Sequence, residues 1–166
     1  LRNFTDGDVP ALAALVARYQ ATPAAAWDRP WPTDPEAIAG AVRWFAAGDT
    51  FLAVCRRSVA PSTRHWRAAP VQPACDTGEL IGYVALNPEE DLGTFNLGYV
   101  FEAAHHGRGY ATEACRALLD HAFRTLIAAR VVTGTAAANV PSCRLLARLG
   151  FTRTGESLGS FRTDAS

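Results

Sequence analysis

The chain of 166 residues contains no lysine and no methionine, so all 16 of its basic residues are arginine. The absence of lysine excludes a Walker phosphate-binding loop, which needs a Gly-Lys-Ser/Thr sequence. Together with abundant alanine, this use of arginine is typical of a GC-rich genome, and we expect a bacterial protein. The formal net charge is zero. Because nucleic-acid-binding proteins usually carry a basic surplus, we expect no nucleic-acid partner.

Long hydrophobic runs are also absent. No apolar stretch approaches the ~20 residues of a membrane span, and no signal-peptide pattern opens the chain. We therefore expect no membrane partner and a cytoplasmic location. The four cysteines form no CxxC pair and no His/Cys spacing typical of zinc, so no metal is predicted. Cys115 and Cys143 are expected in the core, whereas Cys55 and Cys75 flank one loop. A disulfide between the last two is a minor alternative, because the chain otherwise resembles an intracellular protein.

The remaining composition, 49% hydrophobic and 19% charged, is typical of one globular domain, which we expect to span residues 1–166. Apolar and capping patterns predict helices over residues 5–19, 35–47 and 110–127. A short last helix in PSCRLLARLGF is predicted to stop at Gly150, with Phe151 folded back on Leu146 in a Schellman-type cap. Extended apolar runs predict strands over residues 50–56, 79–87, 94–102 and 129–137, with a further strand in the tail after residue 151. The proline-rich segment 58–77 is predicted to be an exposed loop insertion. The order of these elements predicts a mixed α/β fold, with a mostly antiparallel sheet and helices on both faces. Its final strand–helix–strand unit predicts one parallel pair.

One short stretch, HHGRGYATEACRALL (His105–Leu119), joins a glycine-containing turn to an amphipathic helix that is expected to begin near Tyr110. The first N–H groups of a helix lack intrahelical partners and carry the positive end of its dipole. Gly107 and Gly109 can adopt positive φ and allow another group to approach the main chain closely. A strand, a glycine turn and a helix N-terminus together can bind a phosphate or pyrophosphate. The glycines are equally compatible with a simple tight turn, and their spacing does not match a dinucleotide fingerprint.

A second motif, NVPSCRLLARLGF, runs from Asn139 to Phe151. With HGRGYA (His106–Ala111), it resembles the GNAT superfamily of acyl-CoA-dependent N-acetyltransferases, which carries a Q/R-x-x-G-x-G/A turn followed by an N-x-x-S…LGF element. LGYVF, GRGYATEA, NVPS and LGF look similar to the RimJ/RimL-type branch of ribosomal-protein N-terminal acetyltransferases. The resemblance covers residues 82–156 strongly and residues 1–53 weakly. His106 stands where the superfamily often has Gln or Arg.

This resemblance implies a GNAT fold in which two parallel strands, here residues 96–102 and 131–137, splay apart around the pantetheine arm of acetyl-CoA. Acetyl-CoA is the implied acyl donor substrate, with no metal. The residues implied to bind it are Val100, Phe101, His106, Gly107, Arg108, Gly109, Tyr110, Ala111, Thr112, Asn139 and Ser142. A main-chain N–H directed at the thioester carbonyl would stabilise the developing oxyanion. The Arg108 side chain either adds charge beside the pyrophosphate or is a surface arginine.

The resemblance also implies two catalytic roles. Ser142, beside the expected thioester sulfur, would donate a proton or hydrogen bond to the leaving thiolate, although a serine there can also simply begin a helix. A covalent route through Cys143 is disfavoured, because no histidine is spaced to activate it. The acceptor amine must lose a proton, and Glu102 and His105 are the nearest groups to receive it. Both would otherwise belong to a solvated loop.

The acceptor side is less constrained by the sequence. Trp27, Asp28 and Trp31 fall in the family's variable acceptor segment, where ring faces and a carboxylate can hold an amine; the tryptophans would otherwise pack on the sheet. Tyr99 is included with them, and is the second choice as hydroxyl donor. The predicted function is direct acetyl transfer to an amine, either a protein N-terminus or a small molecule such as an aminoglycoside, polyamine or amino acid. A non-catalytic acyl-CoA-binding module is the alternative. Strand edges that need covering predict a homodimer.

Overall fold

The computed structural model describes residues 1–28, 30–56 and 78–157. Its strands and α-helices follow the chain as β1 (Arg2–Asn3), α1 (Val9–Gln20), α2 (Pro35–Ala47), β2 (Phe51–Arg56), β3 (Glu79–Pro88), β4 (Thr94–Phe101), α3 (Tyr110–Arg124), β5 (Arg130–Val132) and α4 (Val140–Leu149). Three short 3-10 helices are η1 (Asp6–Asp8), η2 (Pro23–Trp27) and η3 (Ala103–His105). The predicted loop 58–77 lies outside the described residues. Within the described ranges, every helix is too short or too polar to cross a membrane.

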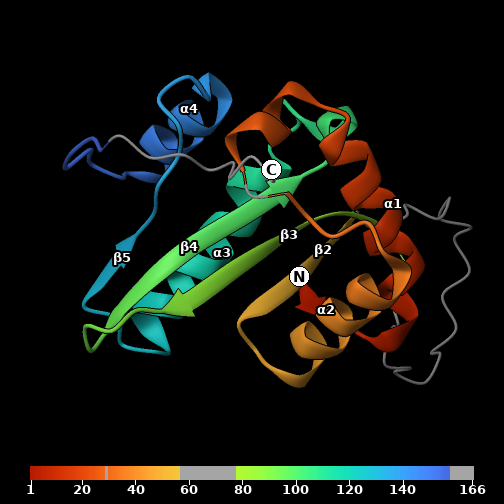
Figure 1. Ribbon diagram of the computed structural model, residues 1–166. Helices are drawn as coiled ribbons and strands as arrows, with labels where there is room; N and C mark the ends of the chain where they lie inside the picture. Colours follow the sequence, from red (N-terminus) through yellow and green to blue (C-terminus); the bar gives the residue numbers. More distant parts are fainter. Residues whose placement is uncertain (29, 57–77, 158–166) are drawn as a thin grey trace, which may run out of the picture.

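In the described part of the chain, five strands form one sheet in the order β1-β2-β3-β4-β5 (Figure 1). The first four strands pair antiparallel, and β4 and β5 pair parallel. The parallel pair follows from the connection between these strands, because α3 carries the chain back to the end of the sheet at which β4 began. The predicted mixed, mostly antiparallel sheet is confirmed.

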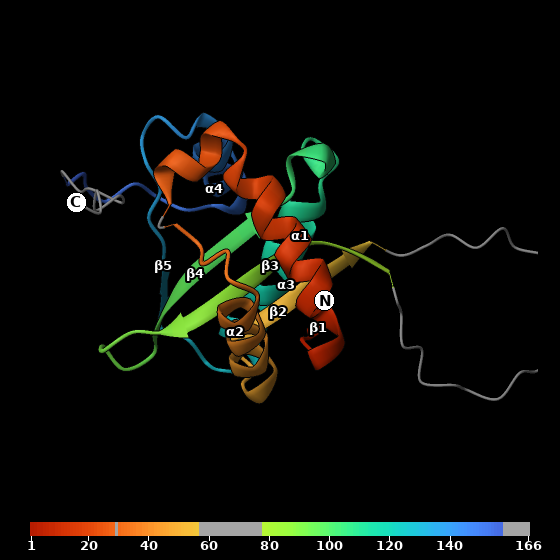
Figure 2. The same cartoon turned by 45° about the vertical axis from the view of Figure 1, so that its right-hand side comes forward.

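Helices cover both faces of this sheet, as Figure 2 shows, with α1 and α2 on one face and α3 on the other. The alternation of side chains along β2 divides the core in the same way. Phe51, Ala53 and Cys55 pack toward the α1 and α2 face, whereas Leu52 and Val54 pack toward the α3 face. A strand with both faces buried must be apolar at nearly every position, which is what the FLAVC segment provides.

Local signals set the bounds of α2, which are those predicted. The Asp34 carboxylate accepts a hydrogen bond from the Ala37 N–H at 2.8 Å, and Pro35 occupies the first helical position. The buried face of this helix is formed by Ile38, Val42 and Phe45.

The C-terminus of α4 is also as predicted. Gly150 has φ of 89° and the Phe151 N–H donates to the Leu146 carbonyl at 3.0 Å, which completes a Schellman-type cap.

Four predicted elements differ from the structure. The helix predicted from residue 5 begins as the 3-10 helix η1 and continues as α1 only from Val9. The strand expected over residues 129–137 is only three residues long, because the chain leaves β4 after Val132 and has no further ladder partner. Helix α3 ends at Arg124 rather than near residue 127, and Ile127 has φ of 53° in the connection to β5. Residues 152–157 form no strand, and the rest of the tail in which a further strand was predicted lies outside the described residues.

The cysteines of the described ranges, Cys55, Cys115 and Cys143, carry free thiols. Burial raises the pKa of the Cys115 thiol to about 12, consistent with an inert core residue. Cys143 is only partly buried, in contrast to the expected core position, because its place in the first turn of α4 leaves it near the surface. Cys75, the suggested disulfide partner of Cys55, lies outside the described residues.

Candidate active site

The main chain at the end of β4 lacks a partner on one side. Pairing with β5 stops at Asn96 and Val132, and the Thr133 hydroxyl then donates to the Leu97 carbonyl at 2.8 Å. Figure 1 shows β5 and β4 running apart beyond this point. From Gly98 to the end of the strand, β4 is paired only with β3. Its other edge is therefore available to an extended group that carries its own hydrogen-bonding atoms.

A cavity of about 350 Å³ lies at this unpaired end of β4. It is lined by the glycine turn, the start of α3, the inner face of α4 and one side of α1. The acetyl-CoA-binding residues predicted from the sequence all contribute to its wall except Arg108, which is exposed. The structure thus brings together, from three separate elements, residues that the sequence presents as two distant motifs.

The glycine turn has the backbone conformation that the sequence predicts. Gly107 and Gly109 have φ of 73° and 86°, a region that side chains with a Cβ rarely adopt. A Cβ added at either position would meet no atom within 4 Å, so the space above the turn is open. Helix α3 begins immediately afterwards, at Tyr110. Its unpaired N–H groups and the positive end of its dipole therefore adjoin the cavity.

His106 connects this turn to the end of β4. Its Nε2 lies 3.0 Å from the carbonyl oxygen of Phe101 and donates to it in the tautomer that carries hydrogen on that atom. The imidazole thereby holds the last residue of β4 against the turn that follows it. Glutamine and arginine, which the resemblance leads one to expect here, also carry side-chain N–H donors, so histidine can make the same kind of contact.

Two hydroxyl groups meet on the cavity wall. The Tyr99 and Ser142 oxygens lie 2.6 Å apart, so one hydroxyl donates to the other. Burial raises the pKa of the Tyr99 phenol, and the hydrogen bond with Ser142 only partly offsets this shift. The pair therefore keeps both of its hydrogens at neutral pH. Ser142 is held in place by its own N–H, which donates to the Asn139 side-chain oxygen at 3.3 Å, so Asn139 caps α4.

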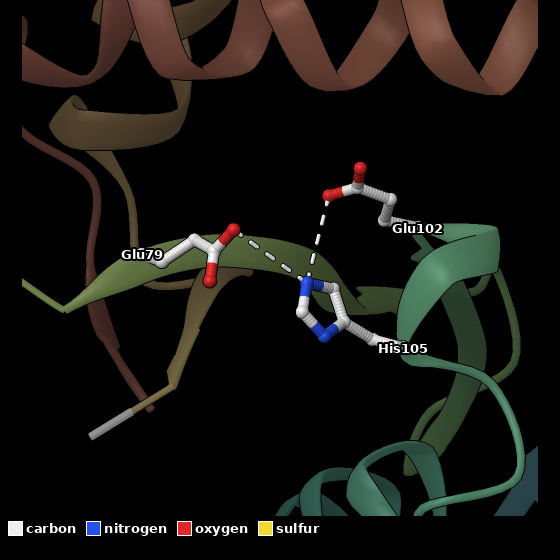
Figure 3. Close-up of side chains that lie close together, drawn as sticks. All are labelled: Glu79, Glu102 and His105. Carbon is white, nitrogen blue, oxygen red and sulfur yellow. Dashed lines mark ion pairs between the residues drawn. The ribbon is translucent and has the colours of Figure 1, made fainter. Parts of the chain in front are cut away.

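An ion-pair network occupies the other end of the site, directly after β4. The Glu102 carboxylate is held by two nitrogens of Arg18, at 2.5 Å and 3.2 Å. Glu79 pairs with Arg56 at 2.9 Å. The His105 Nε2 lies between the two carboxylates, 3.7 Å from Glu79 and 3.8 Å from Glu102 (Figure 3). His105 also lines the cavity, so the network adjoins the space in which the hydroxyl pair lies.

Only one of the four residues predicted to bind the acceptor lines the cavity. Tyr99 lines the cavity, whereas Trp27, Asp28 and Trp31 do not. Trp31 packs edge-on against the rings of Phe45 and Tyr83, in the core beneath α2. The exposed fraction of Trp27 is 40%.

Asp28 approaches the site through one neighbour. Its carboxylate accepts a hydrogen bond from the Tyr19 hydroxyl at 3.4 Å, and Tyr19 lines the cavity. Burial, followed by the nearby charge of Asp28, raises the pKa of the Tyr19 phenol to about 12.

Several cavity residues are absent from the sequence prediction. Tyr19 and Ala24 come from α1 and η2, which no motif connects with the glycine turn. Leu145 and Arg148 were detectable in principle, because they follow Ser142 at three-residue steps and so share its helix face.

The family of the chain is shown by comparison with known protein families. The model described as an acetyltransferase (GNAT) domain matches residues 1–152. The chain belongs to the GNAT acetyltransferase family. A curated relative of this GNAT protein is the N-acetyltransferase YnaD of Bacillus subtilis, which is described as uncharacterized. The two are 30% identical over 76 residues, which make up 46% of this chain and 45% of YnaD. The matched region is thus less than half the length of that relative.

Solved structures share the fold of this GNAT protein. The ribosomal-protein-S5-alanine acetyltransferase of Vibrio fischeri superposes with a TM-score of 0.72 at 18% identity, covering 94% of this chain and 80% of that one. Mycobacterium smegmatis RimJ, solved in complex with CoA-disulfide, gives a TM-score of 0.66 at 21% identity, covering 93% and 70%. At these identities the likeness shows the fold alone. These relatives are bacterial, which agrees with the expectation from composition.

Proposed function

We propose that this GNAT protein is an N-acetyltransferase that moves an acetyl group from acetyl-CoA directly to an amine. The observation that carries the proposal is the Tyr99–Ser142 hydroxyl pair. It lies in one cavity with the glycine turn and the unpaired end of β4. The hydroxyl pair, the glycine turn and the unpaired end of β4 each serve a different part of a thioester substrate. A site that only bound the substrate would not need the hydroxyl pair.

The acyl donor is bound mainly through the main chain. In the proposal, the N–H groups of Arg108, Gly109, Ala111 and Thr112 hold the pyrophosphate, supported by the dipole of α3. The main chain of Val100 and Phe101 pairs with the amide groups of the pantetheine arm. A backbone N–H at the thioester carbonyl stabilises the oxyanion that develops there, an effect typically worth a few kcal/mol.

Transfer then needs one proton donor and one proton acceptor. The amine nitrogen attacks the thioester carbon, and the C–S bond breaks as the tetrahedral intermediate collapses. The Ser142 hydroxyl, hydrogen-bonded to Tyr99, donates to the departing thiolate. The proton lost by the amine goes to the group of residues after β4 that includes Glu102 and His105. No step requires a metal, and Cys143 takes no part.

For the acceptor we favour a protein N-terminal amine. Support comes from the resemblance to RimJ/RimL-type enzymes and from the shared fold with a ribosomal-protein-S5-alanine acetyltransferase. Trp27 and Asp28 remain proposed acceptor residues, with Asp28 acting through Tyr19, whereas Trp31 packs against Phe45 and Tyr83. A small amine such as a polyamine, aminoglycoside or amino acid is the alternative substrate. A cytoplasmic location belongs to the same proposal.

Two measurements on one preparation test this function. Thermal-shift titration with acetyl-CoA should raise Tm, because a ligand that binds only the folded state stabilises it. Thiol release and product mass should then be followed with an alanine-initiated peptide, spermidine, kanamycin and free amino acids. Acetylation of the peptide supports the favoured acceptor, and acetylation of spermidine or kanamycin supports the alternative. Binding of acetyl-CoA without thiol release from any amine would identify a non-catalytic acyl-CoA-binding module and overturn the proposal.

A further inference from the structure

The network after β4 contains three groups that could accept a proton, and their surroundings differ. Both carboxylates are already compensated, because Glu102 is paired with Arg18 and Glu79 with Arg56. Protonating either carboxylate would break an ion pair and leave an arginine without its partner. The imidazole of His105 has no such constraint.

The position of the His105 ring suits a group that gains a positive charge. Its Nε2 lies 3.7 Å and 3.8 Å from the two carboxylates, too far for strong hydrogen bonds but close enough for both to stabilise an imidazolium. Its Nδ1 points away from both carboxylates (Figure 3). That atom is buried and has no hydrogen-bond partner among the described residues. The side chain, with 9% of its surface exposed, therefore keeps unused hydrogen-bonding capacity at the cavity wall.

A bound cation is the competing explanation of this cluster. One ligand atom from each of Glu79, Glu102 and His105 lies within 4.8 Å of the others. Arg18 and Arg56 neutralise both carboxylates, however, so the five side chains with a neutral imidazole carry no net charge to attract a cation.

We propose that His105 is the group that accepts the proton of the acceptor amine, and that Glu102, held by Arg18, is a positioning residue for its ring. This inference rests on the proposed acetyl transfer. An N–H bond of the amine breaks, its electron pair stays on nitrogen, and the proton forms an N–H bond on the imidazole. The neutral amine attacks, the C–N bond forms and the C–S bond breaks. The Ser142 hydroxyl donates its hydrogen to the thiolate and regains one from a second N–H bond of the same nitrogen. One proton is released overall. It leaves His105 past Glu79, whose side chain is half exposed.

The inference also restricts the acceptor. A proton acceptor of this kind is needed for an amine that is mostly protonated at neutral pH, which means an aliphatic amine such as a peptide N-terminus or a polyamine. An amine that is already neutral in solution would gain little from His105.

The test compares His105→Gln with wild type in an alanine-initiated peptide assay between pH 7 and pH 9.5. The charged groups nearest the ring are Glu79 from β3 and Glu102 after β4, with Arg18 from α1 and Arg56 from β2 behind them; α3 contributes the Tyr110 ring. At pH 7 we expect kcat/KM to fall about 10²-fold or more. The defect should shrink toward pH 9.5, where the peptide α-amine, with a pKa near 8, is neutral in solution. A merely structural role predicts a defect that does not change with pH.

Three companion variants complete the test. His121→Gln, on the distal part of α3 and outside the cavity, should match wild type at every pH. His105→Asn replaces His105→Gln if the latter does not fold, as judged by Tm and circular dichroism. Glu102→Gln should lower kcat less than His105→Gln and leave the acetyl-CoA thermal shift unchanged. A larger defect for Glu102→Gln, with the same dependence on pH, would make Glu102 the acceptor and overturn the proposal.

The remaining outcomes separate this inference from the proposed function. Wild-type turnover with a fully active His105→Gln variant overturns only the role of His105. Activity lost in EDTA and restored by Zn²⁺ overturns it in favour of a metal site. A wild-type protein that acetylates no amine overturns both the function and the inference.

Discussion

Among single side chains, the contact between Tyr99 and Ser142 leads to the most direct prediction. Ser142→Ala should lower kcat by about 10²–10⁴-fold and leave acetyl-CoA affinity nearly unchanged, because the hydroxyl acts mainly as the thiolate forms. Tyr99→Phe removes the other half of the pair and should have a smaller effect, since Ser142 keeps its own hydrogen. For each variant, kcat comes from initial rates with the identified acceptor, and acetyl-CoA affinity comes from calorimetric titration.

A merely structural serine would give the opposite pattern. The free energy of unfolding of Ser142→Ala would fall by about 1–3 kcal/mol, because the partly buried Tyr99 phenol loses its partner, while turnover of the folded fraction stayed normal. A decrease in kcat of less than about threefold would assign Ser142 to structure.

A second prediction concerns Asp8, which is buried and bonded twice by Arg2, at 2.6 Å and 2.7 Å. The Arg2 hydrogen bonds hold the pKa of the Asp8 carboxyl below its ordinary value, against the effect of burial. Because the folded pKa is the lower one, this carboxylate stabilises the protein above the unfolded pKa near 4, and that contribution is lost as pH falls further. Asp8→Asn should lower the free energy of unfolding by about 1–3 kcal/mol at pH 7.

Urea unfolding at several pH values checks this prediction. The difference between wild type and Asp8→Asn should narrow from pH 5 toward pH 2, as the wild-type carboxylate becomes protonated. A difference that stayed constant over this range would show that packing, and not charge, accounts for the loss.

Among the secondary-structure elements, the glycine turn before α3 can be tested with an internal control. Gly109→Ala forces an alanine into positive φ and should cost about 1–2 kcal/mol of stability. It should also weaken acetyl-CoA binding, because its Cβ enters the space above the turn. Gly150→Ala, with φ of 89° at the end of α4 and equally open surroundings, should cost the same stability and leave acetyl-CoA affinity unchanged. Calorimetric titration measures the acetyl-CoA affinity of both variants, and Tm measures their stability. If Gly109→Ala bound acetyl-CoA as tightly as Gly150→Ala, the glycine turn would have no role in phosphate binding.

The elements that the sequence predicts best are those specified by neighbouring residues. The bounds of α2, the start of α3 at Tyr110 and the cap at Gly150 each depend on a proline, glycine or capping side chain within a few positions. The length of β5 was not predictable in this way. Its ladder ends at Val132 and Asn96, although the segment predicted as a strand continues to residue 137.

The same distinction applies to the site. The glycine turn and Asn139–Ser142 motif are contiguous in sequence and could be recognised there. The Arg18–Glu102 pair joins positions 84 residues apart, and the contact of His105 with Glu79 depends on the strand register of β3. Residues close in sequence can also be separated by the fold. Trp31 was predicted to share a site with Asp28, but its ring packs against Phe45 and Tyr83.

At the scale of the whole molecule, the homodimer remains a prediction. Large apolar side chains are exposed beside the β3–β4 turn and the α3–β5 connection, with Leu92 99% and Ile127 74% exposed. Covering such residues and the short outer strands would favour self-association. Light scattering at tens of micromolar should give twice the mass of one chain, and a monomer alone at that concentration would contradict the prediction.

The divergence of β5 from β4 has a consequence for folding itself. It places a strand edge inside the molecule, where a sheet normally has its most protected hydrogen bonds. A ligand that completes this edge would act as a removable part of the fold, with its binding free energy added to the stability of the domain. At one hundred times its dissociation constant, such a ligand adds about 2.7 kcal/mol. If acetyl-CoA is that ligand, the folded fraction of the protein in the cell depends on the metabolic supply of activated acetate.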